Sequence, residues 1–175
     1  MADSTKTLIC PACGKEMEKV YIERAQCFLD ICTNGCGGIF FDNREFKKFD
    51  EEAESIDEIK AALEGKTFKT VDASYKRICP ACGMKMMKNS TSIKGEIIVD
   101  DCYSCGGKFL DYGELDKIRA EYKTEEERSQ DVINYLKANM GAEFEEMQAH
   151  KLMSERKSKD KKSGNIINNI IDKFL

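Results

Sequence analysis

Eight of the nine cysteines fall into two sets that share nearly the same internal spacing. Each set opens with a Cys-Pro-Ala-Cys-Gly run, which begins at Cys10 and again at Cys79, and each closes with a second pair of cysteines. Thiolates spaced in this way can direct four sulfur atoms at one tetrahedral ion. The two sets are Cys10, Cys13, Cys32 and Cys36, and Cys79, Cys82, Cys102 and Cys105.

Structural zinc is the chemistry that this pattern favours, because Zn²⁺ takes four thiolate ligands in closed sites. The proline of each run presets the φ angle of a tight turn, and Gly14 and Gly83 suit the left-handed position that follows. We therefore expect two Zn²⁺ ions per chain, one in each set. Because three residues instead of two separate Cys32 from Cys36, we expect the first site to be the looser one.

Three other uses of the cysteines are weighed against zinc. Structural disulfides fit poorly with an odd cysteine count and a reducing compartment. A four-thiolate tetrahedron also suits redox iron, alone or as part of a cluster, and this alternative stays open. Dithiol chemistry of the thioredoxin type normally uses one CxxC within a βαβ pattern, which the sequence does not predict.

The remaining candidate residues have simpler interpretations. Cys27, the ninth cysteine, aligns with Ile97 of the second repeat, which predicts a small buried strand residue; the alternative is a spare ligand or a redox-sensitive thiol. We call the tight turn that carries each pair of cysteines a knuckle. We expect Asp30, Asp100 and Asp101 to be solvated at strand ends or to contact the knuckle backbone. No phosphate loop or nucleophile–base pair accompanies them, so we predict no catalytic residue and no enzymatic activity.

A hairpin, a knuckle, a strand and a helix are predicted in each repeat. Asp42 precedes Glu45 by three residues, as Asp111 precedes Glu114, which is a variant of the capping box with Asp expected as the N-cap. The strand-like runs are 20–22, 27–29 and 97–99.

Apolar residues at helical spacing predict the helices. The first helix is expected to start at Asp42 and to end near Gly65, with one apolar stripe through Phe46, Phe49, Ala53, Ile56, Ile59 and Leu63. The second carries Leu115, Ile118 and Tyr122. A third apolar stripe passes through Val132, Ile133, Leu136, Met140, Phe144 and Met147.

The pattern Cys-Pro-x-Cys-Gly, followed by Cys-x-x-Cys-Gly-Gly-x-Phe-x-Asp-x-x-Glu-Leu, resembles the transcription factor IIB-type zinc ribbon of small bacterial proteins. The second repeat fits best, from Cys105 to Leu115, although family members often carry Trp where Phe109 stands. The first repeat departs through its longer knuckle and Phe46 in place of Leu. The resemblance covers about residues 8–50 and 77–120 and implies a rubredoxin-like ribbon and zinc binding, while it transfers little about activity.

We therefore predict a small α+β fold with two rubredoxin-like four-cysteine zinc ribbons, each followed by an amphipathic helix, and a helical C-terminal extension. The predicted parts are a first ribbon with its helix at 1–65, a linker at 66–77, a second ribbon with the start of its helix at 78–123, a helical extension at 124–153, a charged flexible linker at 154–164 and a short amphipathic helix at 165–175.

Composition narrows the function classes. The formal net charge of −4 argues against a generally basic nucleic-acid-binding surface. Neither a signal peptide nor a membrane-spanning apolar run is predicted, so we expect a cytoplasmic protein.

The leading functional hypothesis is a binding adaptor, in which the ribbons hold a rigid surface and the helices or the C-terminal stripe contact a protein partner or a second copy. A nucleic-acid-binding regulator is the first alternative, and an iron-binding redox protein is the second.

Overall fold

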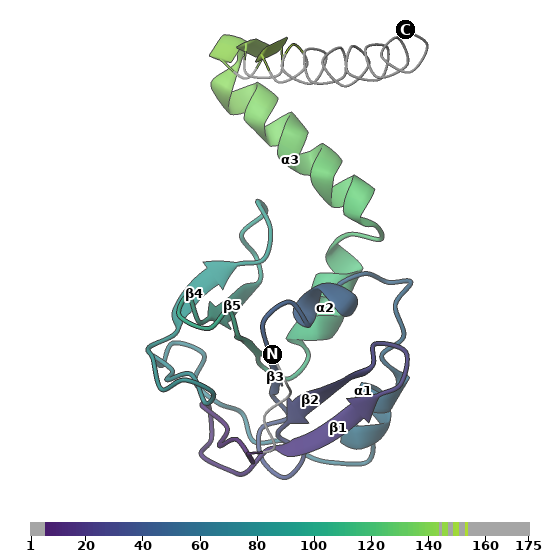
Figure 1. Cartoon of the computed structure of the whole chain (residues 1–175), viewed down its shortest axis with the longest axis vertical. Coiled ribbons are helices and arrows are strands. Elements are labelled where there is room, and N and C mark those ends of the chain that lie inside the picture. Colours follow the sequence, from purple (N-terminus) through teal and green to yellow (C-terminus); the bar gives the residue numbers. More distant parts are fainter. Residues whose placement is uncertain (1–5, 144, 147–148, 151–152, 154–175) are drawn as a thin grey trace, which may run out of the picture. The chain divides into compact units, whose positions relative to one another are not determined.

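The structure is a computed structural model that describes residues 6–143, 145, 146, 149, 150 and 153. The chain divides into two compact units, Met1–Arg128 and Ser129–Leu175. The first unit holds all the strands described below (Figure 1). The elements of the ribbons are β1 (Glu18–Ile22), β2 (Cys27–Ile31), β3 (Ile39–Phe41), the 3₁₀ turn η1 (Phe46–Lys48), α1 (Asp57–Leu63), β4 (Met87–Ser90), β5 (Ile98–Asp101), β6 (Lys108–Leu110) and α2 (Glu114–Glu121).

The two ribbons share one antiparallel sheet of six strands, in the order β1-β2-β3-β6-β5-β4. Each ribbon supplies three neighbouring strands, and the two sets of three meet where β3 pairs with β6. In that pairing Phe40 lies opposite Phe109, the residue at the equivalent position of the other repeat. The sheet therefore has an approximate internal twofold symmetry centred on these two phenylalanines.

The two faces of the sheet carry different cores, because successive strand residues point to opposite faces. Phe41 and Leu110 face the helices and join one buried apolar cluster with Ile59 of α1 and Ile118 of α2. Phe40 and Phe109 belong to a second cluster, which contains the cysteines. One face thus packs on helices and the other on the two cysteine groups, within the small α+β fold that the sequence predicts.

The first helix differs from the prediction of one continuous helix between Asp42 and Gly65. The chain forms η1, then turns, and only then forms α1 from Asp57 to Leu63. The interruption coincides with Arg119 of α2, whose guanidinium donates to the backbone carbonyls of Phe49, Glu52 and Glu54 at 2.7, 2.9 and 2.6 Å. Carbonyls that accept from Arg119 are turned away from the helical ladder, so a long-range contact overrides the local apolar period.

The capping prediction holds only in part. The Glu45 and Glu114 carboxylates each accept from the backbone N–H three residues earlier, at 2.8 and 2.7 Å, which is one half of a capping box. Asp111 is not the N-cap of α2, because that position is Gly113, in the left-handed conformation. The Asp111 carboxylate instead accepts from Arg77 at 2.9 Å.

The second unit contains most of helix α3 (Glu125–Met140), whose first turn belongs to the first unit. Helical positions follow at 142, 143, 145, 146, 149, 150 and 153, in line with the predicted helical extension. The segments predicted for 154–164 and 165–175 lie outside the described residues. Within the described part of the chain, no helix combines the length and the apolar character needed to cross a membrane.

Candidate metal centres

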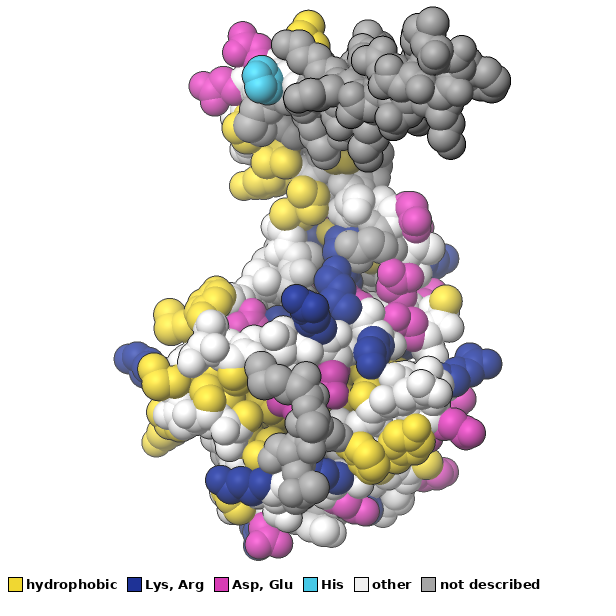
Figure 2. Space-filling model, in the orientation of Figure 1, with side chains coloured by type: hydrophobic (Ala, Val, Ile, Leu, Met, Phe, Trp, Pro, Cys, Tyr) yellow, Lys and Arg dark blue, Asp and Glu magenta, His cyan; other side chains and the backbone are white. Residues whose placement is uncertain are grey.

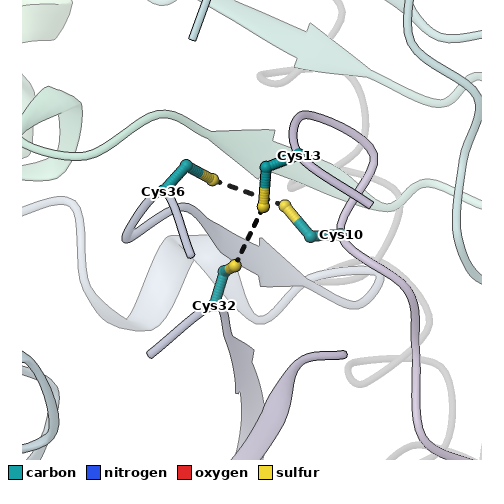
Figure 3. A group of neighbouring side chains, drawn as sticks. All are labelled: Cys10, Cys13, Cys32 and Cys36. Atoms are coloured by element: carbon teal, nitrogen blue, oxygen red, sulfur yellow. Dashed lines mark hydrogen bonds between the residues drawn. The ribbon is translucent and has the colours of Figure 1, made fainter. Parts of the chain in front are cut away.

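The structure brings the eight predicted cysteines together as the two expected groups of four. Within each group all four sulfur atoms lie within 4.8 Å of one another. In the first group (Figure 3) the Cys10 and Cys36 sulfurs are 3.5 Å apart, and those of Cys13 and Cys32 are 3.4 Å apart. In the second group the matching distances are 3.6 Å and 3.4 Å.

These distances fit a metal ion at the centre of each group. Four sulfurs placed at 2.3 Å from a tetrahedral Zn²⁺ are about 3.8 Å apart, close to the distances observed. Each group offers four thiol ligands in a closed set, and soft thiolates are the ligands of zinc and iron sites. The residues present therefore fit a structural four-thiolate metal site in both ribbons.

The knuckles owe their shape to short-range backbone hydrogen bonds. In the first knuckle Cys10 N–H donates to the Lys15 carbonyl at 2.8 Å and Gly14 N–H donates to the Cys10 carbonyl at 2.9 Å. The knuckle at Cys79 repeats both bonds at the same lengths. Gly14 and Gly83 have φ angles of 74° and 76°, the left-handed conformation that the sequence predicts for them.

The thiols of the first group differ in their pKa values. The hydrogen bond between the Cys10 and Cys36 sulfurs raises the pKa of Cys10 and lowers the pKa of Cys36 to about 6. Burial raises the pKa of the Cys32 thiol to about 11. Cys10, Cys13, Cys32 and Cys36 would hold a divalent cation as thiolates, and the cation's charge would take the place of these shared protons.

In the second group, a hydrogen bond from the Met84 backbone N–H lowers the pKa of Cys82 to about 7. Burial raises the pKa of Cys79 and of Cys105. Each group therefore contains one sulfur with a lowered pKa and others with a raised pKa. This pattern is expected where neighbouring thiols share protons through hydrogen bonds.

The structure does not bear out a looser first site. The sulfur–sulfur distances in the two groups agree within 0.1 Å, and the first group is the more buried of the two. The extra residue between Cys32 and Cys36 is accommodated by Gly35, whose backbone lies against the sulfurs. Cys27 stands outside both groups and packs against the helix-side core from β2, as predicted for a strand residue, but it is half-buried and not buried.

Two carboxylates close to the knuckles, Asp30 and Asp100, are buried, so the expectation that they are solvated at strand ends is wrong. Asp100 accepts from Arg77 at 2.8 Å and from Lys88 at 3.1 Å, and Asp30 accepts from Lys19 at 3.0 Å. A buried carboxylate is stabilised by a paired cation, and Lys19 of β1, Lys88 of β4 and Arg77 supply these cations here. Asp101, which is half-buried, pairs with Lys108.

Arg77, which pairs with two carboxylates beside the second metal centre, was not predicted from the sequence. Its side chain is 2% exposed, lies between Asp100 and Asp111, and has its guanidinium carbon 4.9 Å from the centre of the Phe109 ring. The equivalent position of the first repeat is Leu8, so alignment of the repeats gave no sign of it. The sequence indicated its role only through its position, directly before Ile78 and the first cysteine of the second repeat.

Two hairpins that each clamp a group of four cysteines, joined through a shared sheet, define a tandem zinc-ribbon protein. Residues 9–51 and 78–121 both match the family described as "Transcription factor zinc-finger", the TFIIB-type zinc ribbon. Over these two segments the chain belongs to that family, as two ribbons in tandem. No curated protein and no solved structure matches the chain.

Proposed function

We propose that this protein is a binding adaptor, in which two Zn²⁺ ions hold a rigid surface for a protein partner, and that it has no enzymatic activity of its own. Zinc is preferred to iron because four-thiolate ligand sets that replace a large core are typical of structural zinc sites. A closed set of four ligands leaves no coordination position for an activated water.

The observation that carries the adaptor role is the exposed apolar surface of the second ribbon. Met84 and Tyr103, one beside each knuckle, are 55% and 74% exposed. Figure 2 shows hydrophobic side chains gathered over the part of the surface that β4 and β5 form. Exposed apolar groups of this kind, with Met and Tyr among them, are typical of protein interaction sites. The exposed large apolar residues of the second ribbon are Ile78, Met84, Met87, Ile93, Ile98 and Tyr103.

A photo-crosslinking amino acid at position 103 or 84 tests the proposal in cells. We expect each position to give one discrete adduct with a partner or a second copy of the chain. Lys117 and Lys60, which are exposed on α2 and α1, serve as control positions and are expected to give none. Equal crosslinking at the test and control positions would contradict the adaptor surface.

One observation favours nucleic acid as a second candidate ligand. Tyr21 and Phe28 form an exposed aromatic pair across β1 and β2, with ring centres 4.9 Å apart, and Arg24 lies in the turn between these strands. Arg24, Lys47 and Lys48 also line one open hollow. Exposed aromatics beside basic residues can stack unpaired bases.

Fluorescence anisotropy with labelled single-stranded RNA and DNA at physiological salt separates this candidate from the adaptor. Binding that falls at least about tenfold in Phe28→Ala, and that weakens as salt rises, would support it. Met84→Ser is the matched control, because Met84 is exposed on the other ribbon. No salt-dependent binding would remove the candidate.

A further inference from the structure

The two metal centres differ in exposure although they come from equivalent sequence. At three pairs of equivalent positions the residue of the first centre is the more buried. The pairs are Cys13 and Cys82, Cys36 and Cys105, and Gly37 and Gly106. Cys82 is the one metal-ligand candidate among the eight that is classed as exposed.

Gly35 shields one pair of sulfurs in the first centre. A Cβ atom at Gly35 would lie 2.7 Å from the sulfur of Cys13 and 2.7 Å from that of Cys32, so the Gly35 backbone lies directly over both. The equivalent sulfurs of the second centre belong to Cys82 and Cys102. The knuckle that holds Cys102 is one residue shorter and has no glycine between its two cysteines.

The linker between the ribbons covers the first centre further. Lys69 N–H donates to the Gly35 carbonyl at 3.2 Å. Phe68 packs on Tyr112 with ring centres 4.6 Å apart and ring planes tilted by 45°, and both rings lie against Gly37. At the second centre, in contrast, both residues between Cys102 and Cys105 are exposed.

We propose that the second centre is an oxidative modification site, at which a peroxide attacks the Cys82 sulfur, and that Gly35 and the linker protect the first centre from the same reaction. Thiolates react with oxidants according to their access to solvent, and this access is the property in which the two centres differ. The proposal rests on zinc occupancy of the sites, and its test uses the protein without a bound partner, because the proposed adaptor residues Met84 and Tyr103 flank the same sulfurs.

The reaction balances without a further reagent. The Cys82 sulfur attacks one oxygen of hydrogen peroxide, the O–O bond breaks, and one water leaves after protonation, which gives a sulfenic acid. The Cys102 sulfur, 3.4 Å away, then displaces the hydroxyl group as a second water and forms a disulfide. Two thiolates, one peroxide and two protons thus become one disulfide and two waters, and Zn²⁺ leaves because two of its ligands are lost.

The test uses the full chain loaded with two Zn²⁺ and exposed to dilute hydrogen peroxide. A chromophoric chelator follows zinc release, while alkylation and peptide mass spectrometry identify the oxidised cysteines. We expect one zinc to leave on the order of ten times faster than the other, with a Cys82–Cys102 disulfide while the first group stays reduced. Equal rates, earlier oxidation of the first group, or fast zinc loss without peroxide would overturn the proposal.

A pair of histidine variants assigns the fast phase to one sulfur. Cys82→His keeps a zinc ligand but removes the attacked sulfur, so we expect the fast release to disappear. Cys13→His, the equivalent change in the first centre, is expected to leave the fast release unchanged. An unchanged fast phase in Cys82→His would overturn the proposal. Should that variant not hold its second zinc, the order of oxidation in the unaltered chain decides.

Discussion

Two glycines set how closely the ribbons approach each other. A Cβ on Gly38 would lie 2.3 Å from the tip of the Phe109 ring, and one on Gly107 would lie 2.5 Å from the tip of Phe40. Each phenylalanine therefore packs on the glycine of the other ribbon, on either side of the β3–β6 pairing. A side chain at either glycine would separate the two halves of the sheet.

Gly38→Ala is expected to destabilise the protein by about 1–3 kcal/mol, because overpacking a filled site forces its neighbours to move. Urea unfolding of the zinc-loaded protein measures the effect. Combining it with Phe109→Leu should cost less than the sum of the two single changes, because the obstructing ring is gone. If the two losses of stability were strictly additive, the contact between Gly38 and Phe109 would not limit the approach of the ribbons.

Arg77 compensates the negative charges of Asp100 and Asp111 in the second ribbon. It is buried beside two carboxylates, and loss of one partner from a buried ion pair leaves an uncompensated charge. Arg77→Leu introduces the residue found at the equivalent position of the first repeat. We expect it to cost about 3–5 kcal/mol in the free energy of unfolding.

The matched control for Arg77→Leu is Arg24→Leu, which changes an exposed arginine and is expected to stay within about 0.5 kcal/mol of the parent. Thermal unfolding at equal zinc content compares the two. Adding Asp111→Asn to Arg77→Leu should recover part of the loss, since one of the two carboxylates left without Arg77 is then neutral. No recovery would indicate that lost packing, and not charge, dominates.

At the scale of elements, α2 shapes the segment that follows the first ribbon. Arg119 donates to three backbone carbonyls between Phe49 and Glu54, and Arg128 donates to the buried Asp50 carboxylate at 2.6 Å. These contacts join residues roughly seventy positions apart in sequence. They hold residues 49–54 as a turn between η1 and α1, where an apolar period alone predicts a helix.

Arg119→Met is expected to lower stability by about 2–4 kcal/mol, because hydrogen bonds from a charged donor are lost and the carbonyls lose their partner. Hydrogen exchange followed by mass spectrometry should show faster exchange in residues 49–56 before other segments respond. Lys117→Met, on the same helix and exposed, is the control and should leave exchange unchanged. Uniform acceleration across the sheet would contradict a local role.

At the scale of the molecule, the ribbons are joined by a sheet and not only by the linker. The pairing of β3 with β6 makes each ribbon the neighbour of the other, so the two metal centres stabilise one continuous structure. The predicted boundaries at 1–65 and 78–123 remain predictions, which the following experiment also addresses.

Replacing Cys10 and Cys13 by Ser removes the first metal centre, and we expect the zinc content to fall from two ions to one. Structural zinc contributes about 10–16 kcal/mol of apparent binding energy, comparable to the stability of a whole domain. Because β6 loses its partner when the first ribbon unfolds, exchange protection should fall in β6 as well as in β1 to β3. Unchanged protection in β6 would mean that the ribbons fold independently.

Both cysteine groups, the turns that form the knuckles and the Glu capping bonds could be predicted from the amino-acid sequence. Each depends on residues close in sequence or on a spacing that repeats, and such geometry is fixed by the backbone within a few residues. The identity of the family followed from the same short patterns.

How the two repeats combine, in contrast, depends on contacts between residues far apart in sequence. The β3–β6 pairing, the burial of Arg77 and the break between η1 and α1 each depend on residues that lie far apart along the chain. A three-residue strand carries no signal for its partner, and an arginine is normally expected at the surface. Only packing the two ribbons together made these contacts favourable and left the second metal centre more open than the first.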